Sequence, residues 1–461
     1  MAGESLILGV VVFYLLLISA LGVYMRKRIH GFADFMVAGR SAGLGVVAAS
    51  YVGSHFGGGM TVGGAELGAR SGLSGIWYGL ACGFSYLLLL VIVPKVYVLK
   101  GMTAADVLEH AYGTKRVRAL FAVVAFAGSV GIIGGQILAG GAMFAAFGVS
   151  QEIGGIVTFV IIVFYCALSG LYGVMITDTI QVAIGGLGVV LGAAIAIKRI
   201  GGVGQLATLP AQDLSLFPAD LGTLIWLVVP VTLNGLISQP AYQRINACRD
   251  EKTAFRAPLL GALVVIVLSI FPVLAGMCAR LLWPDIDPAM AIPQLLKEVF
   301  PPVAAAIFIA AILAAIMSTA DSVLLAGVAN LVRDIYQQIL RPNASDKELL
   351  RMSSLATVVI GIGALAVTYL VPTIIDLFLA SYAIQVCGGL IPVVGALLWK
   401  KGTELGAWAA FVVGVGFVSL STLKVIDIPY HYVVGLAPAL VVYVCVSLLT
   451  ERAEEKDGER R

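Results

Sequence analysis

The sequence predicts an all-α integral membrane protein with thirteen transmembrane helices. Of its 461 residues, 60% are hydrophobic and 12% are charged, whereas soluble domains carry about 25% charged residues. Apolar runs of the roughly 20 residues that a helix needs to cross the bilayer recur along the whole chain. The predicted spans lie near residues 5–25, 43–68, 72–97, 118–147, 151–169, 175–198, 221–242, 256–283, 301–333, 351–371, 374–399, 404–421 and 432–450.

The first predicted span is typical of a retained transmembrane helix rather than a secretory signal peptide. It lacks a basic n-region and a clear small-residue cleavage site, and basic residues follow it. With an extracellular N-terminus, most of the 29 Lys and Arg residues fall on the cytoplasmic side, as the positive-inside rule requires. The net charge of +3 then reflects membrane orientation rather than nucleic-acid binding. The six cysteines show neither metal-ligand spacing nor a disulfide framework, so we expect free packing residues.

Two predicted spans are interrupted in the middle of the membrane. In the second span the run Gly57–Gly59 would weaken a continuous helix, because each Gly costs about 1 kcal/mol relative to Ala. In the seventh span Asn234, Gly235 and Pro240 interrupt the run, and Pro removes a backbone donor and clashes with the preceding turn. Close packing at Gly and a simple Pro kink would explain either span alone. Two such spans, five helices apart, instead indicate a transporter site between two repeats.

These breaks divide the chain into two units of five helices. Because five is odd, the second unit enters the membrane from the opposite side, so we predict two inverted repeats with broken first helices, one helix before them and two after. The predicted organisation is an extra N-terminal transmembrane helix with a basic cytoplasmic loop (1–42), a first repeat (43–198), an extracellular loop (199–220), a second repeat (221–399), two C-terminal transmembrane helices (400–450) and a charged cytoplasmic tail (451–461).

A polar stretch, AAIMSTADSVLLA, lies inside the apolar ninth span. Ala315, Ser318, Thr319 and Ser322 share one helix face, and Asp321 lies on the flank of that face. Ser and Thr in membrane helices often bond to their own helix or join neighbouring helices, which would explain the hydroxyls. That reading does not explain the carboxylate, because an ionisable residue in a span is costly and functional by default.

Oxygen ligands for a hard cation are expected where this polar face meets the first break. The break offers free carbonyls near Gly53 and Phe56, and hard cations take carbonyl, hydroxyl and carboxylate oxygens. Asp178 is another candidate ligand, or a solvated residue at the helix N-terminus of span six. Glu66 and Asp376 are expected at the outer ends of their spans.

Four motifs together carry a family resemblance. They are FADFMVAGRSAG before the first broken span, SGLYGVMITDTIQ entering span six, SQPAYQR in the second broken span and AAIMSTADSVLLAGVANLVRDIYQ in span nine. With these motifs the chain resembles the sodium:solute symporter family over nearly its whole length, with local resemblance to the choline, proline and pantothenate branches. The resemblance implies the fold of two inverted five-helix repeats first known from a leucine transporter.

The resemblance also implies ion sites. The main sodium site would comprise three carbonyls and two hydroxyls, from Gly53, Phe56, Ala315, Ser318 and Thr319. A second cation site found in some relatives would map to Asp178, Ser318, Asp321 and Ser322. Because Asp321 stands where certain relatives carry a hydroxyl residue, sodium, a proton and no ion remain alternatives for this second site.

The solute would bind between the two broken helices, faced by spans three and four. The residues expected to line this cavity are His55, Phe56, Gly57, Phe84, Gln136, Ser238 and Gln239. The SQP sequence resembles the proline and pantothenate branches, whose substrates bear a carboxylate. Because no Lys or Arg is expected deep in a span, an anionic group would meet bound sodium, half-helix N–H groups or protonated His55. His55 could equally be a neutral packing residue bonded to a nearby carbonyl.

The sequence therefore predicts a symporter that imports a small organic solute with co-transported sodium by alternating access. We expect an amino-acid-like zwitterion or a carboxylate as the solute. A proton-coupled transporter of the same fold and a non-transporting membrane sensor are the alternatives. No enzyme activity is expected, because neither a cluster of nucleophile and base nor a metal motif is present. The expected partners are the solute and the lipid bilayer of the plasma membrane, with no nucleic acid, no obligate protein partner and no cofactor besides the sodium ion.

Overall fold

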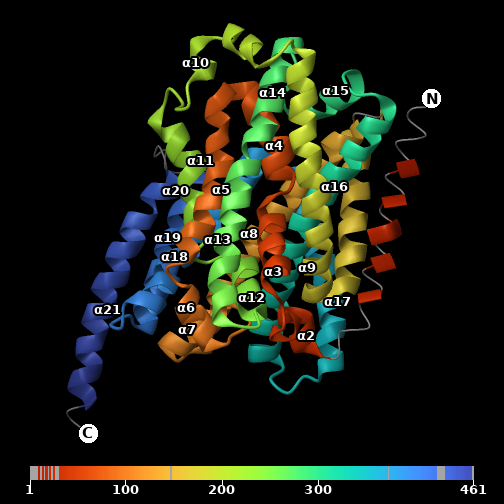
Figure 1. The fold of residues 1–461 in the computed structure, drawn as a ribbon. Coiled ribbons are helices and arrows are strands. Elements are labelled where there is room, and N and C mark those ends of the chain that lie inside the picture. The colour runs from red at the N-terminus through yellow and green to blue at the C-terminus, as the bar shows by residue number, and fades with distance from the viewer. Residues whose placement is uncertain are drawn as a thin grey trace.

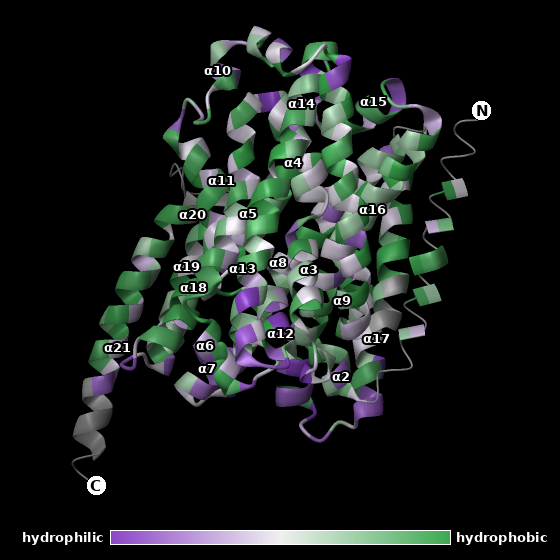
Figure 2. Cartoon of the chain, in the orientation of Figure 1, coloured by the Kyte–Doolittle hydropathy of each residue, from purple (hydrophilic) through white to green (hydrophobic). Residues whose placement is uncertain are grey.

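The computed structural model describes residues 9, 10, 13, 14, 16–18, 20, 21, 24, 25, 31–145, 148–371, 373–422 and 431–458. Within this part the architecture is helical, apart from one isolated bridge between Ala42 and Cys248. Most helices run side by side along one direction (Figure 1). Figure 2 shows hydrophobic residues along the outer helices, and hydrophilic residues at the two ends and in the lower half of the bundle. This distribution fits the predicted membrane protein.

The helices of the predicted first repeat follow a short helix, α2 (Phe32–Val37). They are α3 (Leu44–His55), α4 (Gly58–Ser71), α5 (Ile76–Leu89), α6 (Val93–Leu99), α7 (Ala104–Tyr112), α8 (Lys115–Ala145) and α9 (Gln151–Arg199). The long α9 contains both predicted spans five and six, and Gly170 separates them with a left-handed φ of 58°. The short α7 begins with a capping box between Thr103 and Asp106, which fixes its start.

The helices of the predicted second repeat follow a loop that carries η4 (Val203–Thr208) and α10 (Ala211–Leu214). They are α11 (Leu221–Asn234), α12 (Gln239–Ala247), α13 (Glu251–Leu268), α14 (Ile270–Leu282), α15 (Ala291–Glu298), α16 (Pro302–Val328), the π-helix η6 (Ala329–Leu340), α17 (Asp346–Thr368) and α18 (Ile374–Leu398). The chain continues through α19 (Glu404–Thr422), α20 (His431–Val434) and α21 (Leu436–Gly458). Figure 1 places α10 and α15 at one end of the bundle and α2, α6 and α7 at the other.

Eight helical stretches of the described residues are long and apolar enough to cross a membrane, and three shorter apolar helices accompany them. Much of the first predicted span, the basic loop after it and the end of the C-terminal tail lie outside the described residues. The count of thirteen spans and the inverted arrangement of the repeats therefore stay predictions. No disulfide joins the six cysteines, all of which lie in the described part of the chain, and five of them are buried.

Helix α16 forms part of the interior of the bundle. It packs against α8 and α9 and also contacts α3. From Phe308 to Val328 every side chain is buried, including the polar stretch at its centre. Polar groups at this depth must find partners inside the protein, because lipid supplies none.

Candidate functional site

The first break separates α3 from α4 at Phe56 and Gly57. Phe56 leaves the helical conformation (φ −79°, ψ 65°), and Gly57 is extended. The Gly57 N–H turns back to the His55 carbonyl at 2.9 Å, and the helical ladder resumes where Thr61 N–H meets the Gly57 carbonyl at 2.9 Å. The Gly53 carbonyl thus loses the N–H donor that a continuous helix would supply. The predicted break in the second span is confirmed.

A hydroxyl of α16 takes the place of that missing donor. Thr319 Oγ1 donates to the Gly53 carbonyl at 2.7 Å. Close approach of the two helices needs glycine, because a Cβ on Gly53 would collide with Ser318 Oγ and one on Gly57 would collide with Thr319. The structure therefore brings Ser318 and Thr319 directly against the broken helix.

The two other predicted ligands of the main sodium site meet at Gly185 of α9. A Cβ on Gly185 would lie 3.0 Å from the Phe56 ring and 3.5 Å from the Ala315 Cβ. Phe56 and Ala315 are both buried. The five residues predicted to supply ligands thus lie where α3, α9 and α16 meet, beside an interrupted backbone.

The second break separates α11 from α12 between Gly235 and Ser238. Gly235 packs directly on the Ser85 backbone of α5, where a Cβ would collide. The Leu236 carbonyl accepts from Tyr242 Oη at 2.8 Å, so part of the freed backbone is satisfied inside the protein. The predicted break in the seventh span is confirmed, and Ser238 lies at its end.

One expectation about charge is wrong, because Arg244 lies deep inside the protein. The sequence placed it in a cytoplasmic loop, two residues beyond the predicted end of the seventh span. In the structure α12 continues to Ala247, and the Arg244 side chain is 0% exposed, paired at 3.3 Å with Asp178, also 0% exposed. A buried guanidinium requires such a partner, since an unpaired charge is costly to bury.

Asp178 belongs to this buried cluster and not to a solvated helix end. Its Oδ1 accepts from Ser318 Oγ, and its Oδ2 accepts from Ser50 Oγ at 2.5 Å. Arg244 Nη2 also donates to Ser322 Oγ at 2.6 Å. Asp178, Ser318 and Ser322, three of the four residues predicted for a second cation site, are therefore joined by Arg244, which sequence reasoning had not included.

Asp321, the fourth residue of that predicted site, is placed differently. Ala314 and Met317 of α16 pack against Tyr14 of the first predicted span. Asp321 follows these two residues on the same side of α16, one turn further along the helix. Its carboxylate oxygens are buried without a hydrogen-bond partner in the described part of the chain. Nearby, Gln181 Nε2 donates to Tyr14 Oη at 3.0 Å. Asp321 therefore takes no part in the hydrogen bonds that join Asp178 to Arg244.

Four of the residues predicted to line a solute cavity lie at the first break: His55, Phe56, Gly57 and Gln136. Gln136 Oε1 accepts from the Gly58 N–H at 2.8 Å, and so binds the start of α4 beside Gly57. The His55 ring contacts Ser85 Oγ through Nε2 at 3.1 Å and packs on the Tyr86 ring at 4.8 Å between centroids. The partner of His55 is thus a hydroxyl and not the carbonyl that the packing alternative expected.

The other predicted lining residues lie on α5 and next to the second break. Phe84 is half-buried on α5. Gln239, next to the second break, is bonded to the segment before α7. Its Oε1 accepts from the Ala104 N–H at 2.8 Å, and its Nε2 donates to the Met102 carbonyl at 3.2 Å.

A second charged cluster surrounds Arg118 at the start of α8. Arg118 pairs with Asp106 and Glu109 of α7 and, at 2.5 Å, with Asp334 of η6. Thr103 Oγ1 also donates to Asp334 at 2.8 Å. Arg118 is the first residue of the predicted fourth span, yet it is 3% exposed and joins three helical segments.

The carboxylates expected at outer span ends are also in ordered contacts. Glu66 is 2% exposed and pairs with Arg70 at 2.6 Å, one turn further along α4. Asp376 accepts from Thr373 Oγ1 at 2.8 Å at the start of α18. Glu66 is therefore more deeply buried than an interfacial residue would be.

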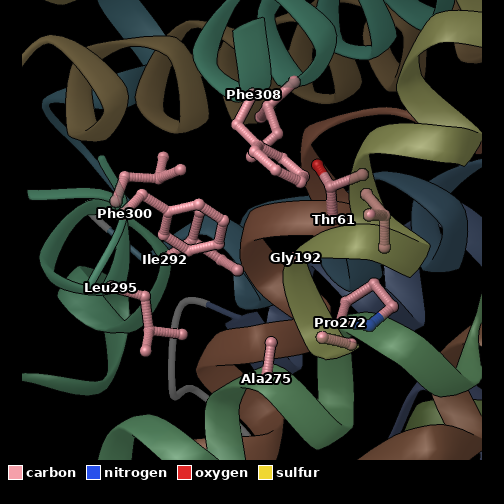
Figure 3. Close-up of a pocket in the computed structure, with 12 residues that line it drawn as sticks. Thr61, Gly192, Pro272, Ala275, Ile292, Leu295, Phe300 and Phe308 are labelled. Atoms are coloured by element: carbon pink, nitrogen blue, oxygen red, sulfur yellow. The ribbon is translucent and has the colours of Figure 1, made fainter. Parts of the chain in front are cut away.

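An apolar pocket lies next to α4 on the side of α15 (Figure 3). Its cavity volume is only about 20 Å³, and Phe300, Phe308, Leu295 and Pro272 are among its lining residues. Thr61 is the polar side chain of that lining. No charged group lines it, so it offers no partner for an ionic group of a solute.

The sequence matches known membrane transporters. Residues 35–414 match the model of the sodium:solute symporter family. The chain is 30% identical to the high-affinity proline transporter PutP of Bacillus subtilis (strain 168), over 94% of this chain and 95% of that protein. It is 29% identical to the sodium/pantothenate symporter of Escherichia coli (strain K12), over 95% of both chains.

Solved structures of transporters share the fold. A Na⁺-coupled sialic acid symporter in a substrate-bound outward-open state superposes with a TM-score of 0.81 at 20% identity, covering 96% of this chain and 97% of that one. The transporter Mhp1 of the nucleobase-cation-symport-1 family, in a closed conformation, gives 0.65 at 14% identity, covering 91% and 94%. These proteins are transporters rather than enzymes. The family match over most of the chain, together with two broken helices beside a hydroxyl-bearing helix, shows that the chain belongs to the sodium:solute symporter family.

Proposed function

We propose that this chain imports a small amino-acid-like zwitterion or carboxylate together with sodium by alternating access across the plasma membrane. The N-terminus would face outside and the C-terminus the cytoplasm. The observation that carries the proposal is the 2.7 Å contact between Thr319 Oγ1 and the Gly53 carbonyl. It joins the polar face of α16 to a carbonyl freed by the first break.

In this proposal sodium binds at the junction of α3 and α16. The ligands are the carbonyls of Gly53, Phe56 and Ala315 with the hydroxyls of Ser318 and Thr319. The donor set fits the ion, because all five groups offer oxygens, which hard cations prefer. The bound ion would tie α16 to the broken helix and favour the outward-open state, to which the solute binds. Closure and rocking then expose both to the cytoplasm, driven by the sodium gradient and about 2.3 kcal/mol per charge per 100 mV of membrane potential.

The solute would bind between the two breaks, beside this ion. His55, Phe56, Gly57, Phe84, Gln136, Ser238 and Gln239 are the proposed lining residues. The start of α4 supports a solute that bears a carboxylate, because backbone N–H groups at a half-helix start favour an anionic group. The names of two relatives support the same class, since proline is a zwitterion and pantothenate a carboxylate.

Thermal unfolding of the purified protein tests this proposal. L-Proline, pantothenate, other amino acids and betaines are added separately in sodium and in potassium buffer, and hits are followed by uptake into proteoliposomes. We expect at least one zwitterion or carboxylate to raise the melting temperature in sodium and not in potassium. Stabilisation that ignores sodium and follows pH would instead favour the proton-coupled alternative. Ligand effects without any uptake would favour the sensor.

A further inference from the structure

The side chain of Gln239 joins α12 to the start of α7. Gln239 is the first residue of α12, directly after the second break, and it is buried. Its Oε1 accepts from the Ala104 N–H at 2.8 Å, and its Nε2 donates to the Met102 carbonyl at 3.2 Å. The oxygen thus meets a donor and the nitrogen meets an acceptor, so the two bonds fix the orientation of the carboxamide.

The start of α7 provides these partners because the first N–H groups of a helix have no acceptor within the helix. The Asp106 carboxylate accepts from the N–H groups of Met102 at 2.6 Å and of Thr103 at 3.0 Å. Ala104, the first residue of α7, donates to Gln239 instead. A side chain of α12 therefore completes the N-terminal cap of α7.

The start of α7 is also bound to α8 and η6. Thr103 Oγ1 donates to Asp334 of η6 at 2.8 Å, and Arg118 of α8 pairs with both Asp106 and Asp334. Hydrogen bonds between ionised groups are about twice as strong as bonds between neutral groups. The neutral Gln239 bonds are therefore the weaker attachment, and we expect them to break first when α12 and α7 separate.

The contact lies toward the end of the bundle that would face the cytoplasm. Figure 1 places α7 with α2 and α6, opposite α10 and α15, and the proposed orientation puts that end inside the cell. The solute is proposed to bind beside the second break, where α12 begins. In alternating access one group of helices rocks against the other around the bound solute. A contact between α12 and α7 therefore crosses the region that would have to open for release.

We infer that Gln239 is a positioning residue for transport: its two bonds to Ala104 and Met102 hold the form that is closed to the cytoplasm, and solute release requires them to break. The inference rests on the proposed function, because it assumes alternating access with α7 at the cytoplasmic end. It gives Gln239, one of the proposed lining residues, a role that needs no contact with the solute.

Two variants remove the contact from opposite sides. Gln239→Leu removes both bonds and keeps a side chain of similar size. Ala104→Pro removes the N–H donor and leaves Gln239 unaltered. Proline is tolerated there, because Ala104 is the first residue of α7 and the preceding Thr103 is extended (φ −133°, ψ 162°). The matched control is Asn246→Leu, since buried Asn246 of α12 donates to the Tyr242 carbonyl of its own helix at 2.9 Å.

Double electron–electron resonance between two spin labels measures the separation of α12 and α7. The labels are attached to cysteines introduced at His110 on α7 and at Arg249 just beyond α12, both of which are exposed. The exposed Cys445 is replaced by serine. The full chain is measured in sodium and in potassium buffer without solute, so a residue that only contacts the solute would leave the distances unchanged.

We expect mainly the short distance in the labelled parent in sodium. Gln239→Leu should raise the ratio of long to short distances about 5- to 100-fold, the effect of losing two neutral hydrogen bonds. Ala104→Pro should raise it about 2- to 10-fold for one bond. The double variant should shift no further than Gln239→Leu alone, because both changes act on one contact. Asn246→Leu should match the parent.

Three results would overturn the inference. They are unchanged distances in both variants, a shift in Gln239→Leu that Ala104→Pro does not share, and an equal shift in Asn246→Leu. Ala104→Pro keeps the test valid if Gln239→Leu fails to fold. If sodium changes neither the distances nor the melting temperature of the labelled parent, the proposed function itself fails. A parent that responds to sodium, with variants that match it, overturns only the role of Gln239.

Discussion

Removal of the Thr319 hydroxyl should weaken sodium binding more than any comparable truncation elsewhere in the bundle. Thr319 Oγ1 lies 2.7 Å from the Gly53 carbonyl, and both are proposed ligands of the same ion. A hydrogen bond or ligand contact to a charged group contributes about 1.5–3 kcal/mol, and each 1.4 kcal/mol corresponds to a factor of ten in affinity. Thr319→Ala should therefore raise the half-saturating sodium concentration about 10- to 100-fold.

The assay is thermal unfolding of the purified protein over a sodium titration at constant ionic strength. Thr357→Ala is the matched control, because Thr357 is equally buried but bonds only to the Ser353 carbonyl of its own helix, at 2.9 Å. Both variants should lose some stability without sodium. Thr319→Ala should also lose most of the stabilisation by sodium, whereas Thr319→Ser, which keeps the hydroxyl, should retain much of it.

Two results would refute this reasoning. The first is a folded Thr319→Ala variant whose half-saturating sodium concentration changes less than about threefold, which is below the smallest loss expected for a charged contact. The second is an equal loss of sodium response in Thr357→Ala, since that change leaves the junction of α3 and α16 intact.

Three further predictions concern the break and the Arg118 cluster. Gly57→Ala should abolish the stabilisation by sodium, because the new Cβ would collide with Thr319, a proposed sodium ligand on α16. Gly43→Ala is the control: its new Cβ has nothing within 4 Å, so the response to sodium should not change in the same titration. Arg118→Ala should lower the free energy of unfolding by about 3–5 kcal/mol, because it leaves buried carboxylates without their cation. Chemical denaturation measures this change. Arg116 is an exposed neighbour, so the free energy of unfolding of Arg116→Ala should stay near that of the unaltered chain. Burial raises the pKa of Asp106, but the Arg118 charge and the hydrogen bonds from Arg118 and the Met102 N–H together outweigh burial and hold that pKa below its usual value. The stabilisation by Asp106 is therefore present above about pH 3.9 and is lost as the pH falls through the lowered pKa. Melting temperatures of the unaltered chain and Asp106→Asn should therefore converge at acidic pH, and a constant difference would contradict this.

The two breaks and the hydroxyl face could be predicted from the sequence because their causes are local. Consecutive glycines at Gly57 and Gly58 weaken a helix wherever it packs. The Asn234–Gly235 pair and Pro240 weaken the helix at the second break. Likewise, the spacing of Ser318 and Thr319 places them near one face of any helix. The structure confirms both breaks and the meeting of that face with the first one. The total number of spans remains a prediction, because part of the first span lies outside the described residues.

By itself, then, the sequence determined a membrane-spanning helical protein, the positions where two helices are interrupted, and a row of hydroxyls beside one interruption. Only the tertiary structure decided the direction of the charged side chains. Arg244 follows the apolar run by two residues, so pattern alone put it in a loop, whereas α12 carries it inward to Asp178. Asp321 adjoins Ser322 in sequence, but it makes no hydrogen bond to the Arg244 cluster that Ser322 joins. The reason is physical: the depth and orientation of a half-helix depend on the surfaces it packs against, and these come from parts of the chain far away in sequence.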